Sequence, residues 1–142
     1  TEGGLDAAGR EGELRPCMDA LRAAGIRVSL FIEPAERQIE AAFRLGAPLV
    51  ELHTGKYCDS EGAAAEAELA RLRSAAGLAH RAGLQVNAGH GIHLGNLAGI
   101  LTLPNLHTLN IGHSLIARAV FIGLEAAVRE MLAGMAAYKG GE

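Results

Sequence analysis

Hydrophobic and polar positions along this chain follow two periods, one typical of helices and one typical of short strands. Apolar side chains recur every three or four residues at Leu14, Met18 and Leu21, at Leu69, Leu72, Ala76 and Ala79, and along a stripe from Val120 through Leu124, Ala127, Val128 and Met131 to Met135. Shorter apolar runs predict strands at Ile26–Ile32, Pro48–Thr54, Leu84–Gly89 and His107–Gly112, with a short helix at Asn96–Leu103. Helices and strands therefore alternate, and one long helix ends the chain.

Local signals mark where these elements begin and end. A glycine lies between a helical pattern and the following strand at Gly25, Gly46 and Gly83, and glycine is favoured just past a helix end because it accepts the left-handed conformation. Glu33 and Pro34 are typical of a cap followed by proline in the first turn of a helix. Residues Thr1–Arg10 show no period and are expected to form a loop.

Alternating helices and strands predict a parallel sheet with right-handed crossovers. Four strands fit either a small open sheet covered on both faces or half of a (β/α)8 barrel, which needs about 250 residues. The second strand favours the half-barrel. Val50 and Leu52 point to one face, whereas Glu51 and His53 point to the other, where an open sheet would bury them under apolar helices. We therefore expect an α/β fold of the TIM-barrel family with about four parallel strands and helices on one face.

Composition and charge narrow the class of protein. The chain has 142 residues, of which 49% are hydrophobic and 20% charged, as expected for one globular domain over residues 1–142. A net charge of −3 without a basic block argues against nucleic acid as partner. No apolar stretch approaches the roughly 20 residues of a membrane span, and no secretion signal is visible. Cys17 and Cys58 form neither a metal-type pair nor a disulfide framework, so we expect a cytoplasmic protein.

The candidate chemistry lies where the last two strands end. Asn87-Ala88-Gly89-His90-Gly91 and Asn110-Ile111-Gly112-His113 each place glycine beside histidine at a strand's carboxyl end, where ligands bind in parallel α/β folds. Glycine lets backbone N–H groups approach an anion, and histidine exchanges protons near neutral pH. The helix predicted to begin at Ser114 adds a positive dipole end. This pattern favours an enzyme site for a phosphorylated small molecule.

Each candidate also has a plainer interpretation. His90 fits a general acid or base, but it also fits a surface turn. His113 fits an anion site or an ordinary helix cap. Glu51 lies two residues before His53 on the same face, so the carboxylate either orients and tunes the imidazole or forms a buried structural pair with it. No HxH or HExxH spacing occurs among the six histidines, so no metal site is predicted.

Five segments in register give the chain a family resemblance. They are Thr1-Glu2-Gly3-Gly4-Leu5-Asp6, Val28-Ser29-Leu30-Phe31-Ile32, Glu51-Leu52-His53-Thr54-Gly55, Asn87-Ala88-Gly89-His90-Gly91 and Asn110-Ile111-Gly112-His113. Together they closely resemble the pyridoxine 5′-phosphate synthases, (β/α)8 barrels of vitamin B6 biosynthesis. The resemblance covers essentially all 142 residues and matches only the carboxyl-terminal half of the family, strands five to eight.

The resemblance implies a reaction and a set of residue roles. The family condenses 1-deoxy-D-xylulose 5-phosphate with 3-amino-2-oxopropyl phosphate, releases inorganic phosphate and water, and uses no metal or organic cofactor. His90 would be the proton donor, Gly91 a substrate contact, and Gly112 with His113 the site for the phosphate of the amino ketone. A contact to deoxyxylulose phosphate would fall at Thr1 or the residue before it.

The same resemblance implies what this chain lacks. The family's other catalytic histidine, its catalytic glutamate and a phosphate-binding arginine belong to the amino-terminal half. The chain is therefore expected to be an inactive fragment of a transferase-class synthase that forms a homo-oligomer when complete. Two alternatives stay open: a non-catalytic phosphate-binding α/β module, and a small open-sheet interaction protein.

Overall fold

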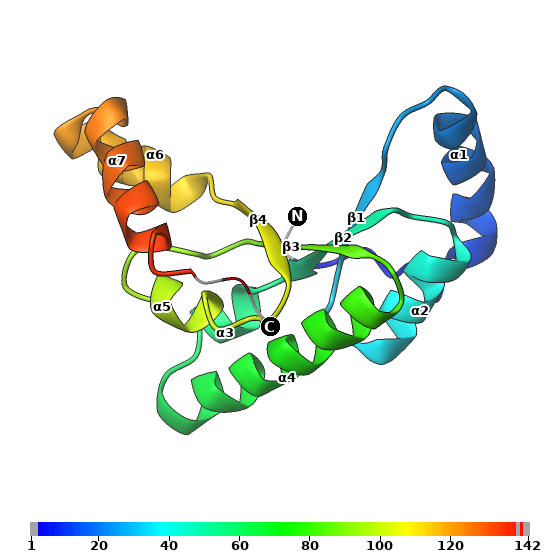
Figure 1. Ribbon diagram of the computed structural model, residues 1–142, viewed down its shortest axis with the longest axis horizontal. Helices are drawn as coiled ribbons and strands as arrows, with labels where there is room; N and C mark the ends of the chain where they lie inside the picture. The colour runs from blue at the N-terminus through cyan, green and yellow to red at the C-terminus, as the bar shows by residue number, and fades with distance from the viewer. Residues whose placement is uncertain (1–2, 139, 141–142) are drawn as a thin grey trace.

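All four predicted strands form one sheet in the computed structural model, which describes residues 3–138 and 140 (Figure 1). They are β1 (Ser29–Ile32), β2 (Leu49–His53), β3 (Gln85–Gly89) and β4 (Leu106–Asn110). The strands are parallel and lie in the order β1-β2-β3-β4, so β1 and β4 are the two edges. This confirms the expected α/β architecture with four parallel strands in a sheet that does not close.

Seven helices connect and flank these strands within the described residues. They are α1 (Glu11–Ala23), α2 (Glu36–Arg44), α3 (Gly55–Cys58), α4 (Gly62–Arg81), α5 (Leu97–Ile100), α6 (His113–Ile122) and α7 (Leu124–Met135). None of the helices in this part of the chain combines the length and hydropathy that a membrane span requires.

Several helix boundaries differ from the sequence prediction. The short helix α5 spans Leu97–Ile100 rather than Asn96–Leu103, and α6 begins at His113 rather than Ser114. The long last helix is broken at Gly123, whose φ of +84° ends α6 and turns the chain into α7. The apolar stripe continues across this break, which is why the periodicity alone did not reveal it. Glu33 and Pro34 do not cap α2, because that helix begins at Glu36 after Ala35. The predicted glycine junctions are confirmed, with positive φ at Gly25, Gly46 and Gly83.

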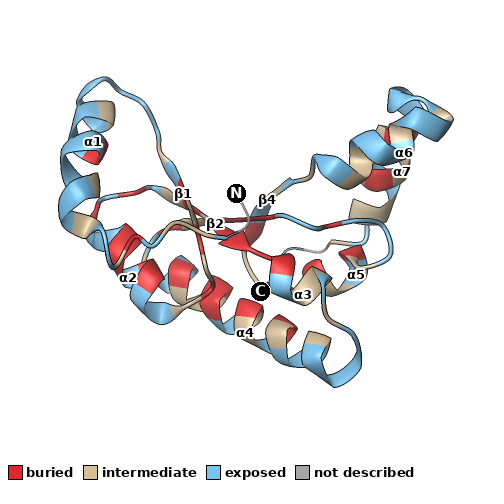
Figure 2. Ribbon diagram, turned by 180° about the vertical axis from the view of Figure 1, so that it is seen from behind, coloured by how far each residue is buried: buried red, intermediate tan, exposed pale blue. Residues whose placement is uncertain are grey.

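The hydrophobic core lies between the sheet and the helices α2 and α4, which pack against it from one side (Figure 1). The buried strand residues Ile32, Val50, Leu52, Val86 and Ala88 belong to the same core cluster as buried residues of these helices, such as Ile39 and Leu72. Figure 2 shows the buried positions of both helices turned toward the sheet, whereas α6 has no buried residue. One face of the sheet is therefore dry and apolar.

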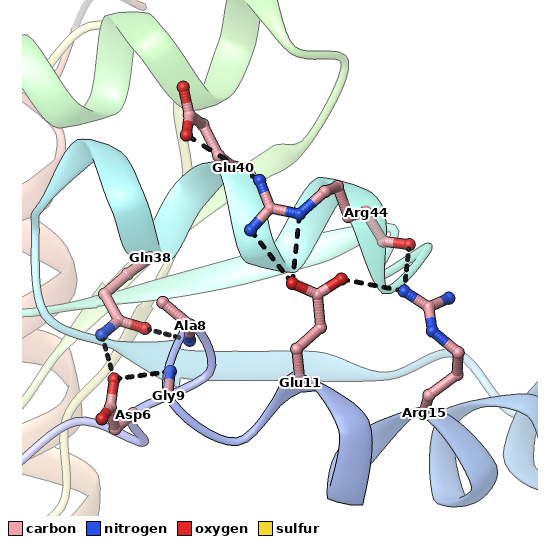
Figure 3. Close-up of polar contacts among 8 residues, drawn as sticks. All are labelled: Asp6, Ala8, Gly9, Glu11, Arg15, Gln38, Glu40 and Arg44. Carbon is pink, nitrogen blue, oxygen red and sulfur yellow. Dashed lines mark hydrogen bonds and ion pairs between the residues drawn. The ribbon is translucent and has the colours of Figure 1, made fainter.

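The segment before α1 is held against α2 by a polar network (Figure 3). Gln38, which is buried, accepts a hydrogen bond from the Ala8 amide (3.0 Å) and donates one to Asp6 (2.6 Å). Glu11 at the start of α1 accepts two hydrogen bonds from Arg44 at the end of α2, at 3.0 and 3.1 Å. These contacts fix the loop that precedes the sheet, and the Leu5 amide donates to the carbonyl of Phe31 on β1 at 2.7 Å.

Because β1 and β4 are edge strands, we can predict whether the chain self-associates when it is produced alone. Unpaired edge strands offer backbone groups to other chains, and α6 adds apolar surface, with Val120 and Phe121 78% and 83% exposed. We expect the 142-residue chain to self-associate edge to edge or to form a molten, aggregation-prone state. Size-exclusion chromatography with light scattering tests this. A monodisperse monomer that unfolds in one sharp transition would contradict it.

Candidate functional site

A cavity of about 580 Å³ lies at the carboxyl ends of β3 and β4. It collects five of the residues predicted from the sequence, namely Glu51, His90, Gly91, Gly112 and His113. Phe31, Ile92, His93, Asn110, Ile111 and Ser114 complete its lining. The parallel register explains this convergence, because Gly89 pairs with His53 on one side and with Asn110 on the other, so three strands end at the same level.

His90 reaches the cavity through an unusual backbone conformation. Its φ is +82° and that of Gly91 is +76°, so two consecutive residues are left-handed at the end of β3. For a residue with a Cβ this conformation costs about 1–2 kcal/mol, and it persists only where the surroundings impose it. Here Thr54, which is fully buried, places its hydroxyl 2.7 Å from the carbonyl oxygen of Gly89. The His90 side chain itself stays exposed.

Gly91 has a steric reason to be glycine as well as a conformational one. A Cβ at this position would lie 2.8 Å from the Cβ of Cys58 on α3. Atoms this close would force the loop after β3 away from α3. The loop that carries His90 is therefore packed tightly against α3, and His90 is held at the rim of the cavity.

The second half of the site is the junction of β4 and α6. Gly112 is the N-cap residue of α6. In the described part of the chain no side chain caps this helix, and nothing lies within 4 Å of where a Cβ of Gly112 would be. The first N–H groups of a helix have no intrahelical acceptor and form the positive end of its dipole. The Ser114 hydroxyl donates to the Ile92 carbonyl at 2.5 Å, which ties this junction to the loop that carries His90. The arrangement is suited to bind an anion.

Glu51 and Asn110 both line the cavity and are hydrogen-bonded to each other. The side-chain amide of Asn110 donates to the Glu51 carboxylate at 2.6 Å. A Cβ at Gly89, which lies between these two residues, would clash with Glu51 Oε1. Glu51 thus faces the cavity from β2, as the alternation along that strand predicted. Asn110 was part of a quoted motif, but nothing in its local sequence indicated this contact.

The structure gives His53 a carboxylate partner other than the one expected. His53 lies 2.7 Å through Nδ1 from Glu33 Oε1, whereas Glu51 contacts Asn110. The ring is 5% exposed and is not among the residues that line the cavity, but its centroid lies 4.8 Å from that of His90. Its Nε2 is buried and has no hydrogen-bond partner within residues 3–138 and 140, which costs about 1–3 kcal/mol when such a group stays unsatisfied. Thr1 falls outside the described residues.

The sequence analysis interpreted Glu33 as a helix cap, whereas in the structure Glu33 is the carboxylate partner of His53. It lies just after β1, where its carboxylate is 3.0 Å from Lys56 Nζ and 3.8 Å from Arg71 Nη2 as well as bonded to His53. Burial on its own raises the pKa of Glu33, but the hydrogen bonds from His53 and Lys56 outweigh it and lower the pKa from 4.5 to about 2. One signal was available in the sequence. Glu33 directly follows the carboxyl end of β1, and His53 lies at the carboxyl end of β2, so both residues belong to the same edge of the parallel sheet.

Metal-ligating side chains do not gather at this site. Among residues 3–138 and 140, no three histidine, cysteine, aspartate or glutamate side chains are grouped so that they could hold a metal ion. What the site does bring together is imidazoles, a carboxylate and a helix amino terminus, groups that move protons and hold anions.

Comparison with known proteins supplies the family context. The family model described as "Pyridoxal phosphate biosynthesis protein PdxJ" matches residues 1–137. A pyridoxine 5′-phosphate synthase of Akkermansia muciniphila is 56% identical over 132 residues, which cover 92% of this chain and 54% of that protein. A pyridoxine 5′-phosphate synthase of Opitutus terrae is 55% identical over 133 residues, which also cover 92% of this chain and 54% of that protein. The chain thus spans about half the length of the curated relatives it matches.

The Glu33 carboxylate predicts a pH dependence of stability. The pKa of Glu33 is lowered in the folded state, so the ionised carboxylate stabilises the fold. Its contribution to the free energy of unfolding is fully present above the unfolded-state pKa near 4.5 and is lost as the pH falls toward about 2. We expect Glu33→Gln to lower the free energy of unfolding most above about pH 5 and progressively less below it. Denaturant unfolding at several pH values measures this difference. A difference between wild type and Glu33→Gln that is constant from pH 3 to pH 7 would show that Glu33 is not held as an ion.

Proposed function

This chain belongs to the PdxJ family of pyridoxal phosphate biosynthesis proteins, and from that premise we propose that it is the carboxyl-terminal half of a pyridoxine 5′-phosphate synthase. Residues 1–142 then supply strands five to eight of a (β/α)8 barrel, and an amino-terminal half supplies the other four. The observation that carries this proposal is the cavity at the carboxyl ends of β3 and β4, which joins His90 to the open amino terminus of α6.

The proposed reaction is the condensation of 1-deoxy-D-xylulose 5-phosphate with 3-amino-2-oxopropyl phosphate, a transferase-class step that releases inorganic phosphate and water. In it His90 donates a proton and Gly91 contacts the substrate. Support comes from the position of the imidazole, which is exposed at the rim of a cavity large enough for a phosphorylated ketone. A positioned general acid of this kind typically contributes about 10²–10⁴-fold to the rate.

The phosphate of the amino ketone is proposed to bind at Gly112 and His113. Three features support this assignment: free space where a side chain of Gly112 would be, the first-turn N–H groups of α6, and an imidazole at the first position of that helix. The Glu51 carboxylate also lines this cavity, and it accepts a hydrogen bond from the side-chain amide of Asn110. Thr1 keeps its proposed contact to deoxyxylulose phosphate.

The same proposal explains the open face of the sheet. In a closed barrel β1 and β4 would each pair with a strand of the amino-terminal half, and the face that carries Phe31 and Glu51 would become the barrel interior. That half is also proposed to hold the second catalytic histidine, the catalytic glutamate and the phosphate-binding arginine. The complete enzyme is proposed to work in the cytoplasm as a homo-oligomer and without a metal or organic cofactor.

The phosphate site is tested by substitution of Gly112. We expect inorganic phosphate to bind the complete protein, and Gly112→Val to weaken that binding at least about tenfold because the isopropyl group fills the space for the anion. Isothermal titration calorimetry measures the affinity. Gly12→Val is the matched control, because among the described residues Gly12 also has nothing within 4 Å of its Cβ position and has no positive φ, but it lies in α1. Equal phosphate affinity in wild type and Gly112→Val would rule out this site.

Catalysis is tested by comparing the chain alone with the complete barrel. We expect no measurable pyridoxine 5′-phosphate from the 142 residues alone and restored turnover when the amino-terminal half is joined to them. In the joined protein His90→Asn should lower kcat by about 10²–10⁴-fold, because asparagine cannot donate a proton as imidazolium does. Chromatographic detection of the product measures both effects. Turnover by the chain alone, or an unchanged kcat in His90→Asn, would contradict the proposed roles.

A further inference from the structure

His53 and His90 form a close pair at the carboxyl ends of β2 and β3. Their ring centroids are 4.8 Å apart and the ring planes meet at 65°, an edge-to-face arrangement. Phe31 packs against both rings, at 5.0 Å from His53 and 6.4 Å from His90. One ring is buried and the other lines the cavity, so the pair connects the interior of the fold to the proposed site of proton transfer.

The contact with Glu33 fixes which nitrogen of His53 carries a proton. A carboxylate only accepts hydrogen bonds, so Nδ1 of His53, 2.7 Å away, must be the donor. Protonation of Nε2 as well would leave a buried N–H without an acceptor, because Nε2 has no partner among the described residues. A His53 ring that donates through Nδ1 alone keeps its Nε2 lone pair available to accept a hydrogen bond.

Nε2 of His53 borders the small space beside His90 that Gly55 leaves free. A Cβ built on Gly55 would lie 2.8 Å from Nε2 of His53 and 3.1 Å from Cδ2 of His90, so both atoms border the same point. A half-turn of the His90 ring about χ2 exchanges Cδ2 with Nδ1. The rotated ring then places Nδ1–H at the former position of Cδ2, beside Nε2 of His53, and moves its own Nε2 to the former position of Cε1.

We infer that Glu33 and His53 are positioning residues for His90, in a Glu33–His53–His90 chain of hydrogen bonds that forms when the His90 ring is rotated. Glu33 accepts from Nδ1–H of His53. Nε2 of His53, which has no partner among the described residues in the present orientation of His90, then accepts from Nδ1–H of the rotated ring. The inference rests on the proposed function, because it takes His90 as the proton donor. When His90 is an imidazolium, its Nε2 proton passes to the substrate, and Nδ1 keeps its proton on the hydrogen bond to His53. No proton moves between the two histidines.

Two cationic side chains, Lys56 and Arg71, hold the Glu33 carboxylate in the position from which it contacts His53. Lys56 on α3 and Arg71 on α4 approach the same carboxylate oxygen, Oε2, and leave Oε1 to His53. Two cations from two helices thus hold the orientation of the carboxylate, and the carboxylate holds the orientation of the imidazole. Outer partners of this kind commonly change activity about 10–100-fold when they are removed.

Kinetics of the complete enzyme test the positioning role. We expect Glu33→Ala to lower kcat about 10–100-fold with KM changed by less than about twofold, because Glu33 touches no substrate. Glu33→Gln keeps an oxygen that accepts from Nδ1–H and should recover most of kcat. Glu68→Gln is the matched control: Glu68 and Glu33 are 27% and 26% exposed and both pair with Arg71, but only Glu33 is bonded to His53. A wild-type kcat in Glu33→Ala, or a loss of kcat in Glu68→Gln as large as that in Glu33→Ala, would overturn the inference.

Nitrogen-15 NMR of the histidine rings tests the same chain of hydrogen bonds without turnover. In the wild type we expect His53 as a single tautomer, protonated at Nδ1, and its Nε2 shifted by a hydrogen bond from His90. His90→Asn should remove that shift, and Glu33→Ala should mix the two tautomers, while Glu68→Gln changes neither. A wild-type His53 protonated at Nε2 would overturn the inference. A complete protein without synthase activity but with these NMR signals would instead overturn the proposed function.

Discussion

The register of the parallel strands is the constraint on which the rest of this structure depends. Val50 pairs with Leu30 and Val86, so the apolar positions of neighbouring strands lie on one face and α2 and α4 can bury them together. The same register ends β2, β3 and β4 at one level, where His53, Gly89 and Asn110 lie side by side. A shift of one residue in any strand would exchange its faces and move its functional end away from the others.

Close packing at this edge turns three strand ends into one site. The buried Thr54 hydroxyl and the tight contact of Gly91 with Cys58 hold His90 in a left-handed conformation that a histidine seldom adopts. Glu33, Lys56 and Arg71 come from a loop and two helices but meet around the buried His53. The contacts that place His90 at the cavity are therefore made by residues of β2 and of the segments after β1 and β2, whereas β3 supplies only the loop that carries it.

The sequence predicted the features that depend on local patterns. Alternation of Val50 and Leu52 with Glu51 identified the apolar face of β2 and the cavity side that carries Glu51, whereas His53, predicted on the open face, is buried. Glycine at positions 25, 46 and 83 marked the helix ends. Features that depend on long-range contacts were missed. Glu33 lies 20 residues from His53 in sequence, and Asn110 lies 59 residues from Glu51, so no local spacing could have paired them. The break at Gly123 was hidden because the apolar stripe runs on from α6 into α7.

The central claim is that the open, polar face of this sheet is the interior of a barrel and that its mouth binds a phosphorylated substrate. A crystal structure of the complete protein with inorganic phosphate tests this most directly. The account predicts that β1 and β4 each pair with a strand from outside residues 29–110, and that phosphate lies against the amides of Gly112 and His113 with His90 across the cavity. Edges left unpaired, or phosphate bound away from the amino terminus of α6, would contradict it.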